Sequence, residues 1–298
     1  MQTPTNLARK PSLIERAADA YQLAERINAR VEREQAIVVG GGGGETLGQS
    51  AHPTPGRIAF IDRGELSDGG FILPDASPTA LAEEFRIVKR QLLQSAMGGQ
   101  GTEPVTNGRA VLISSAEPDE GKTFCAINLA LSMAREREIE VLLVDADFAK
   151  PEILSTLGIA GGPGLVDALS DPAIDVESCV IRTDLPNLSV LPAGRALNET
   201  NELLASEAMR DICEKLTSNP SRIVIFDSSP ALAASTGSVL AGLVGQVVVV
   251  VRADVTGESE LRAALNLLSG CDHVRLLINA VQLQPRGRRF GAYYGYGG

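Results

Sequence analysis

The sequence is short of positive charge and of histidine, and each shortage excludes a class of function. Its 298 residues include 27 lysines and arginines against 37 aspartates and glutamates, a formal net charge of −10. An acidic chain lacks the basic surface that displaces counterions from nucleic acid, so we expect no nucleic-acid partner. Because the chain has only two histidines, we expect no histidine-based zinc site.

Paired cysteines and long apolar runs are also missing. None of the four cysteines belongs to a Cys-x-x-Cys pair, so we interpret them as small apolar residues in a reducing cytosol. No apolar stretch approaches the ~18 residues of a membrane span. The opening residues lack the basic and apolar regions of a secretory signal. The hydrophobic content of 44% still suits a globular core, so we expect a cytoplasmic globular protein.

The most informative segment that is present reads Ala-Glu-Pro-Asp-Glu-Gly-Lys-Thr over residues 116–123. It follows an apolar run at 110–114 and leads into a helical pattern from Cys125. A Gly-Lys-Thr at such a junction turns backbone N–H groups and the positive end of a helix toward an anion. Lys122 can reach the β- and γ-phosphates, and the Thr123 hydroxyl can bind Mg²⁺. The predicted nucleotide-binding residues are Ala116, Pro118, Asp119, Glu120, Gly121, Lys122, Thr123 and Phe124.

Two other apolar runs end in aspartates. Residues 141–144 precede Asp145 and Asp147, and residues 223–226 precede Asp227. An aspartate after a strand is ordinarily a turn former or helix cap. Ligands of a doubly wound sheet, however, bind at the carboxyl ends of its strands, where these side chains meet the lysine. The predicted catalytic residues are Lys122, Asp145, Asp147 and Asp227, and the predicted metal ligands are Thr123, Asp147 and Asp227.

Apolar runs alternate with helical patterns through the centre of the chain. This alternation predicts an α/β fold with a doubly wound, mostly parallel sheet covered by helices on both faces, as in P-loop NTPases. Five consecutive valines at 247–251 suit a central strand. The predicted strands are 110–114, 141–145, 188–192, 223–227, 246–252 and 274–280, and the predicted helices are 79–95, 122–136, 164–170, 201–217 and 257–269.

Changes in composition divide the chain into four parts. Residues 1–38 form an N-terminal helical segment, either a solvated flanking helix or a helix for coiled-coil or partner contacts. Residues 39–76 begin with a glycine-rich flexible linker and continue as an irregular segment that drapes over the main domain. Residues 77–284 form the P-loop domain, and residues 285–298 form a tail.

Tyrosine is concentrated in the tail. Three of the four tyrosines, Tyr293, Tyr294 and Tyr296, lie in the final six residues. Interspersed glycines and the lack of an apolar period predict disorder. A disordered tail does not bury aromatic rings, so we interpret these tyrosines as phosphoacceptors or docking residues. A sticky low-complexity end is the alternative. Beside a triphosphate site, such a tail could present a phenol to its own or a neighbouring subunit.

These motifs resemble those of the bacterial tyrosine kinases (BY-kinases) of the CpsD/CapB type, and more closely the exosortase (XrtA)-associated exopolysaccharide tyrosine autokinases. The resemblance covers roughly residues 78–298, through the loop at 116–123, the strand ends at 144–147 and 226–230, and the sequence Leu-Pro-Ala-Gly at 191–194, together with the tyrosine tail. The opening Ser-Leu-Ile-Glu-Arg-Ala-Ala also resembles that subfamily.

The resemblance implies an ATP- and Mg²⁺-dependent autokinase that phosphorylates its C-terminal tyrosines and regulates exopolysaccharide chain length, polymerisation and export. It implies a membrane-bound chain-length determinant as activator, which recruits the kinase to the inner face of the plasma membrane. By resemblance, Asp227 holds Mg²⁺ through water and Asp145 deprotonates the tyrosine. The family's oligomerisation motif, Glu-x-x-Arg-x-x-Arg, corresponds to Glu83, Arg86 and Lys89, which implies a homo-oligomer.

Two residues of the loop bear on alternative functions. A positioning ATPase of the ParA/MinD type places a lysine directly after the first residue of its loop, where this chain has Glu117. Asp119 stands where the family usually has glycine and puts a negative charge near the phosphates. Aspartate can adopt the left-handed conformation. Its charge, however, favours a further alternative function, a regulator that binds nucleotide weakly and signals by docking its tail.

Overall fold

The fold is taken from a computed structural model, which describes residues 58–77, 79–99, 101, 103–196 and 200–281. The chain divides into one unit of residues 1–50 and another of residues 51–298. The predicted N-terminal helix, the glycine-rich linker and the tyrosine tail lie outside the described residues. Among the helices that are described, none is long and apolar enough to cross a membrane.

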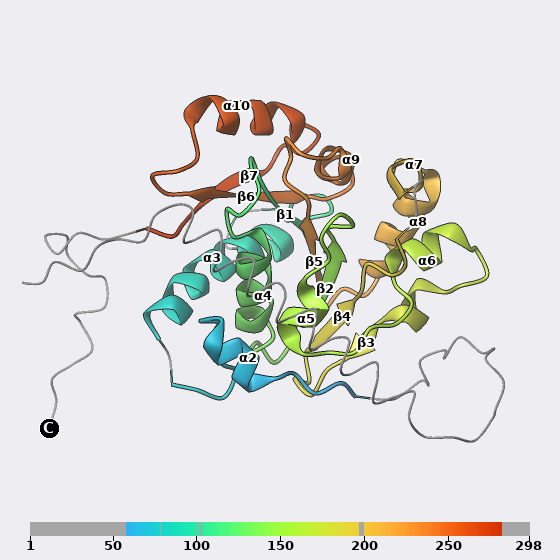
Figure 1. The fold of residues 1–298 in the computed structure, drawn as a ribbon, viewed down its shortest axis with the longest axis horizontal. Helices are drawn as coiled ribbons and strands as arrows, with labels where there is room; N and C mark the ends of the chain where they lie inside the picture. The colour runs from blue at the N-terminus through green and yellow to red at the C-terminus, as the bar shows by residue number, and fades with distance from the viewer. Residues whose placement is uncertain (1–57, 78, 100, 102, 197–199, 282–298) are drawn as a thin grey trace, which may run out of the picture. The chain divides into compact units, whose positions relative to one another are not determined.

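One seven-stranded sheet organises the second unit (Figure 1). The strand order is β3-β4-β2-β5-β1-β6-β7, and every pairing is parallel except that of β3 with β4. The predicted fold class is therefore confirmed. The strands are β1 (Ala110–Ser115), β2 (Glu140–Ala146), β3 (Ile181–Arg182), β4 (Leu188–Leu191), β5 (Arg222–Ser228), β6 (Gln246–Arg252) and β7 (Val274–Asn279).

The central strands are buried on both faces, which is why they read as continuous apolar runs. Along β1, Val111 and Ile113 belong to one hydrophobic core while Ala110 and Leu112 belong to the other. The first core is covered by α2 (Arg63–Asp68), α3 (Ala80–Met97), α4 (Lys122–Met133) and α5 (Ile153–Leu157). The second is covered by α6 (Leu165–Ser170), α7 (Thr200–Leu204), α8 (Glu207–Leu216), α9 (Thr236–Ala241) and α10 (Glu258–Leu267).

Six predicted strands are present with their ends shifted by at most two residues, because apolar runs mark strands clearly. The predicted helix 201–217 is two helices, since a new helix starts after Ser206. The sequence prediction missed the two-residue strand β3, the helices α5 and α9, and a 3₁₀ helix at Val176–Cys179. These elements have six residues or fewer, too few to show a helical or strand period.

The predicted irregular segment of residues 58–76 contains a helix, so that part of the prediction was wrong. The Asp62 side chain caps α2 by accepting hydrogen bonds from the N–H groups of Gly64 and Glu65. Ile61, Leu66 and Ile72 are buried in the first core. Because these three apolar residues come from different local structures, they give no sequence period. The segment is part of the packed fold.

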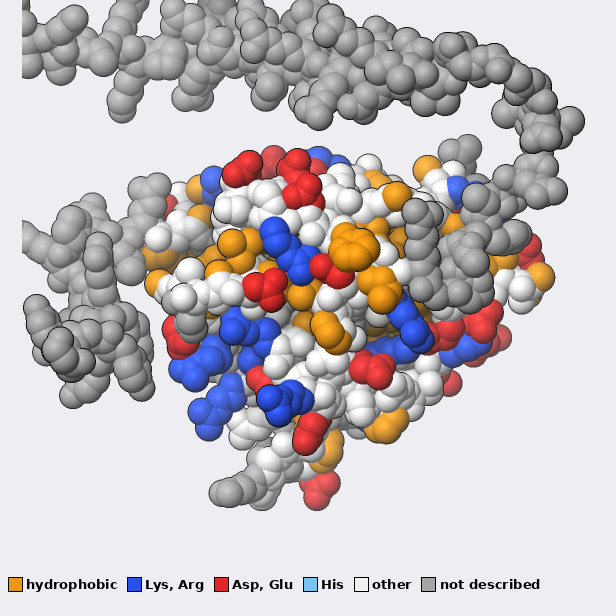
Figure 2. Space-filling view, turned by 90° about the horizontal axis from the view of Figure 1, so that it is seen from below, with side chains coloured by type: hydrophobic (Ala, Val, Ile, Leu, Met, Phe, Trp, Pro, Cys, Tyr) orange, Lys and Arg blue, Asp and Glu red, His pale blue; other side chains and the backbone are white. Residues whose placement is uncertain are grey.

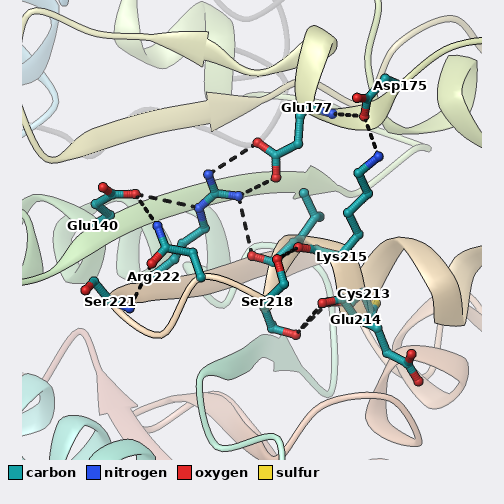
Figure 3. Close-up of polar contacts among 12 residues, drawn as sticks. Glu140, Asp175, Glu177, Cys213, Glu214, Lys215, Ser218, Ser221 and Arg222 are labelled. Carbon is teal, nitrogen blue, oxygen red and sulfur yellow. Dashed lines mark hydrogen bonds and ion pairs between the residues drawn. The ribbon is translucent and has the colours of Figure 1, made fainter.

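An ion-pair cluster braces the amino ends of the strands, the edge away from the predicted site (Figure 3). Arg222 at the start of β5 pairs with both carboxylate oxygens of Glu177, at 2.5 and 3.2 Å. Asn219 donates to Glu140 at the start of β2. A bidentate arginine–carboxylate pair is among the stronger polar contacts, so these side chains add to the backbone pairing of β2 with β5 at this edge.

Charge is unevenly spread over the surface. On the face of the molecule seen from below in Figure 1, lysine and arginine side chains gather toward one side, while acidic side chains are scattered more widely (Figure 2). Part of this face is therefore rich in basic side chains, although the formal net charge of the chain is −10.

Candidate active site

The strand order brings the predicted site residues to one edge of the sheet. Strand β5 lies between β1, which leads into the phosphate loop, and β2, which carries Asp145 near its end. The register pairs Asp145 with Asp227 on the adjacent strand. Because these strands are parallel, the loop and the aspartates meet at their carboxyl ends (Figure 1).

The backbone of the loop has the shape of an anion cradle. Asp119 has φ 60° and Gly121 has φ 93°, both in the left-handed region. The left-handed φ favours glycine at position 121, and a Cβ there would lie 2.2 Å from the Asn279 amide nitrogen and would force that side chain to shift. Helix α4 starts at Lys122 with no side chain capping its first N–H groups. Those N–H groups and the helix dipole are available to a phosphate.

Side chains at the ends of β6 and β7 donate hydrogen bonds to the backbone of the phosphate loop. Arg252 donates to the Asp119 carbonyl oxygen at 2.8 Å, and the Asn279 amide donates to the Glu120 carbonyl oxygen at 3.0 Å. The buried Glu120 carboxylate accepts a hydrogen bond from the Thr256 hydroxyl. The Glu120 side chain therefore points toward the protein, and only its backbone remains for a phosphate.

Asp227 is a buried carboxylate without a hydrogen-bond partner among the described residues. Its side chain is fully buried, and neither oxygen has a hydrogen-bond partner within the described residues, although the Thr123 hydroxyl lies beside it. The pKa of Asp227 is raised to about 8, chiefly by burial and also by the charges of Asp145 and Asp147, although Thr123 and the Lys122 ammonium act to lower it. An orphaned buried carboxylate is costly, which points to a positively charged group that binds here.

Asp145, near the end of β2, and Asp147, just after the strand, differ in their surroundings. Asp145 accepts hydrogen bonds from the N–H groups of Asp147 at 3.3 Å and Ile153 at 3.2 Å. Burial raises the pKa of Asp145 to about 7 despite these two bonds, and the charges of Asp147 and Glu152 add to the rise. Asp147 is less deeply placed and accepts a hydrogen bond from Ser229. A carboxylate with a pKa near 7 suits proton transfer at neutral pH.

The residues at this edge fit a Mg²⁺-bound nucleotide better than a bare metal ion. Within the described residues, no three His, Cys, Asp or Glu side chains form a group that could hold a metal. Mg²⁺ is usually bound by one or two carboxylates together with substrate phosphates and water. Asp227 and Asp147 supply the carboxylates, Thr123 supplies a hydroxyl, and the loop supplies the phosphate cradle.

The structure thus brings together five predicted residues: Lys122, Thr123, Asp145, Asp147 and Asp227. The other predicted loop residues differ from one another in how deeply they are buried. Ala116 is buried at the end of β1, whereas Pro118 and Asp119 are exposed on the loop.

Two predicted site residues have side chains engaged elsewhere. The Phe124 ring lies 4.9 Å from the Phe71 ring and packs on the first core, while the predicted contact of this residue with nucleotide stays a prediction. Lys89 is buried and bonds to the Ser132 carbonyl oxygen at 3.2 Å and the Glu136 carboxylate at 2.6 Å. Its ammonium is engaged inside the subunit, and its predicted role in contacts between subunits stays a prediction.

The sequence prediction missed the residues that support the loop and the aspartates: Ser229, Arg252, Thr256 and Asn279. Arg252 is the last residue of one predicted strand and Asn279 the second-last of another, and these positions at strand ends were the available signal. Nothing local indicates that Asn279 contacts Glu120, because the two residues are 159 positions apart.

Comparison with known proteins agrees with this geometry. A protein-family model described as an AAA domain matches residues 109–271, just over half of the chain. The tyrosine-protein kinase YwqD of Bacillus subtilis is 30% identical over 163 residues, which are 55% of this chain and 68% of that protein. The tyrosine-protein kinase ptk of Acinetobacter johnsonii is 29% identical over 156 residues, 52% of this chain and 21% of that protein.

The tyrosine-protein kinase wzc of Salmonella typhimurium is 27% identical over 251 residues, 83% of this chain and 33% of its own length. The chain therefore spans only about a fifth to a third of the ptk and wzc relatives. Among solved structures, the kinase domain of the Escherichia coli tyrosine kinase ETK superposes with a TM-score of 0.60 at 22% identity, covering 81% of this chain and 94% of that domain. The chain belongs to the AAA-domain family of P-loop proteins and, within it, to the bacterial tyrosine kinases.

Proposed function

We propose that this protein is an ATP-dependent protein-tyrosine autokinase. The observation that supports it most is the convergence of a phosphate loop, Lys122 and three aspartates at one sheet edge, in a chain of the bacterial tyrosine kinase family. This arrangement serves phosphoryl transfer, a reaction in which catalysis is mostly positioning and neutralisation of charge.

Each residue has a role in the proposed transfer. The N–H groups at the start of α4 and the Lys122 ammonium hold the β- and γ-phosphates of ATP. Thr123, Asp147 and Asp227 hold Mg²⁺, which neutralises phosphate charge when bound. The buried Asp145 carboxylate accepts the phenol proton as the tyrosine oxygen bonds to the γ-phosphorus. The bond from that phosphorus to the bridging oxygen breaks, and ADP leaves with the electron pair.

The phosphoacceptors in this proposal are the tail residues Tyr293, Tyr294 and Tyr296. The last described strand before these residues is β7, which borders β6 in the same sheet that carries the site. Residues 282–298 are 17 residues, and a chain of that length spans at most ~56 Å when fully extended, which supports transfer within or between subunits.

The biological setting is proposed from the relatives. The succinoglycan biosynthesis transport protein ExoP of Rhizobium meliloti is 38% identical over 151 residues, although the match covers 17% of ExoP. We propose that this chain regulates exopolysaccharide chain length, polymerisation and export in an exosortase-associated system. Its activator is then a membrane-bound chain-length determinant, which recruits the kinase from the cytoplasm to the inner face of the plasma membrane.

For assembly into a homo-oligomer we propose the predicted residues Glu83, Arg86 and Lys89, of which Glu83 and Arg86 have exposed side chains. Glu83 and Arg86 are exposed on α3 and pair with each other at 2.6 Å, a contact that costs little to exchange for one with a neighbouring subunit. Charge reversal of Arg86 should lower the oligomer size measured by sedimentation, whereas an unchanged size would remove α3 from the interface.

The proposed activity is tested by incubating the purified chain with Mg-ATP and probing for phosphotyrosine. We expect labelling of the full chain, loss of label when residues 291–298 are deleted, and loss of label in Lys122→Met. A matched control is Lys215→Met, which changes a lysine at the opposite edge of the sheet that pairs with Asp175. Full labelling of the deleted form would refute the tail as acceptor, and an unlabelled full chain would refute the kinase activity.

A further inference from the structure

A serine hydroxyl supports one of the site aspartates. Ser229 follows β5, Asp147 follows β2, and the register that pairs Ala146 with Ser228 places them side by side. The Ser229 hydroxyl donates a hydrogen bond of 2.7 Å to Oδ1 of Asp147. Ser229 is 2% exposed and Asp147 is 7% exposed, so water competes little for this contact.

The backbone around Ser229 is fixed by β1. The Ser114 hydroxyl donates to the Ser229 carbonyl oxygen at 3.3 Å. Two residues later, the N–H of Ala231 donates to the Ser115 carbonyl oxygen at 2.8 Å. Because β1 also leads into the phosphate loop, the hydroxyl of Ser229 is held in a set position relative to that loop.

The two carboxylate oxygens of Asp147 differ in their hydrogen-bond partners. Oδ1 accepts from Ser229 and from the N–H of Lys150 at 3.3 Å. Within the described residues, Oδ2 accepts no hydrogen bond. A carboxylate rotates readily about its last bond, since that torsion has a broad, roughly two-fold energy profile. The hydroxyl therefore limits this rotation and keeps one oxygen engaged while the other stays available to a cation.

We propose that Ser229 is a positioning residue that orients the Asp147 carboxylate for Mg²⁺ bound with the nucleotide. The inference rests on the proposed function, because it takes the Mg-nucleotide site as given. Ser229 does not touch the reacting atoms in this account. It acts through Asp147, so its removal weakens the use of Mg²⁺ and leaves the metal-independent contacts of the loop with phosphate intact.

The test measures nucleotide binding to the full-length chain with a fluorescent ATP analogue. Binding is recorded in EDTA and then as Mg²⁺ is added, which separates metal-independent affinity from the Mg²⁺ concentration that gives half of the increase. Ser229→Ala should raise that concentration roughly threefold to tenfold, the scale of one lost side-chain hydrogen bond. Affinity in EDTA should stay within about twofold, since no phosphate contact is removed.

Two variants make the comparison specific. Ser229→Thr keeps the hydroxyl and should restore the parent's Mg²⁺ requirement. Ser228→Ala is the comparison variant, because that buried neighbouring hydroxyl donates to the carbonyl oxygens of Ile113 and Ser229 and not to Asp147. If Ser229→Ala does not fold, Ser229→Cys replaces it, since a thiol has nearly the same size and is a weak donor.

The inference is overturned if Ser229→Ala and Ser228→Ala require the same Mg²⁺ as the parent. It is also overturned if Ser229→Ala loses affinity in EDTA as much as in Mg²⁺, or if nucleotide binding by the parent does not depend on Mg²⁺. Failure of the proposed function has a different signature: Mg²⁺-dependent binding with the expected Ser229→Ala shift, but no phosphotyrosine in the parent.

Discussion

Asp227→Asn should make the nucleotide-free protein more stable at alkaline pH while it impairs Mg-ATP binding. The folded protein buries this carboxylate without a hydrogen-bond partner within the described residues, and burial raises its pKa from 3.8 to about 8. Asparagine has nearly the same shape and carries no charge, so the variant keeps the packing and removes the buried charge.

The sign and size of the effect follow from proton linkage. Between pH 3.8 and about 8 the folded chain holds a proton on Asp227 that the unfolded chain has released, so stability falls as pH rises through this window. Each pH unit corresponds to about 1.36 kcal/mol, which gives an upper limit of ~4 kcal/mol between pH 5 and pH 8. Because an unpaired buried amide also costs ~1–3 kcal/mol at every pH, the pH dependence of the difference is the diagnostic quantity.

The assay is urea unfolding of the full chain at pH 5, 6.5 and 8, with and without Mg-ATP. The stability difference between Asp227→Asn and the parent should shift in favour of the variant by about 1–4 kcal/mol from pH 5 to pH 8. Mg-ATP at 100 times its Kd should stabilise the parent by ~2.7 kcal/mol and the variant by much less. The control Asp211→Asn, an exposed aspartate on α8, should show neither effect. A stability difference that does not change with pH, or equal stabilisation of both proteins by Mg-ATP, would refute the reasoning.

Three further predictions concern the loop, the ion-pair cluster and the segment before α3. Asp119→Gly should tighten ATP binding roughly twofold to tenfold in a titration, because glycine accepts φ 60° and removes a negative charge near the phosphates; weaker binding would contradict this. Glu177→Gln should lower the free energy of unfolding by ~1–3 kcal/mol in urea, since Arg222 loses a bidentate partner, and an effect below ~0.5 kcal/mol would show that the pair is merely a surface contact. Burial alone would raise the pKa of Asp184, but the ion pair with Arg63 holds that pKa below its usual range. The ion pair therefore stabilises the fold above pH ~4, and this stabilisation is lost as the pH falls further and Asp184 is protonated. Asp184→Asn should therefore flatten the acid limb of the stability curve, and an unchanged acid limb would count against the pair.

The sequence was sufficient to predict the central sheet. Strands β1, β2, β5 and β6 are apolar on both faces because helices cover both, and a fully buried strand is visible as a run of Val, Ile and Leu. The same reasoning predicted the convergence of Lys122 with the aspartates, since each follows or precedes such a strand. The residue types at the end of each strand can be read from the local sequence, and the parallel topology brings those strand ends together at one edge of the sheet.

Residues whose partners are distant in sequence could not be placed in this way. Lys89 looked like an exposed member of a helix motif, but its ammonium reaches α4 and the Glu136 carboxylate. Phe124 lies next to the phosphate-binding residues, yet its ring follows the helix face toward Phe71. Ser229 has no local signal for its bond to Asp147, 82 residues away. Side-chain direction depends on the packed structure, which spacing alone does not give.

The destination of the γ-phosphate tests the central claim most directly. The full chain is incubated with Mg-ATP labelled on that phosphate, and the label on tyrosine is compared with the label released as inorganic phosphate. This account predicts label on Tyr293, Tyr294 or Tyr296, absent in Lys122→Met. Label found only as inorganic phosphate, with nucleotide-dependent dimerisation, would contradict it and identify a switch ATPase instead.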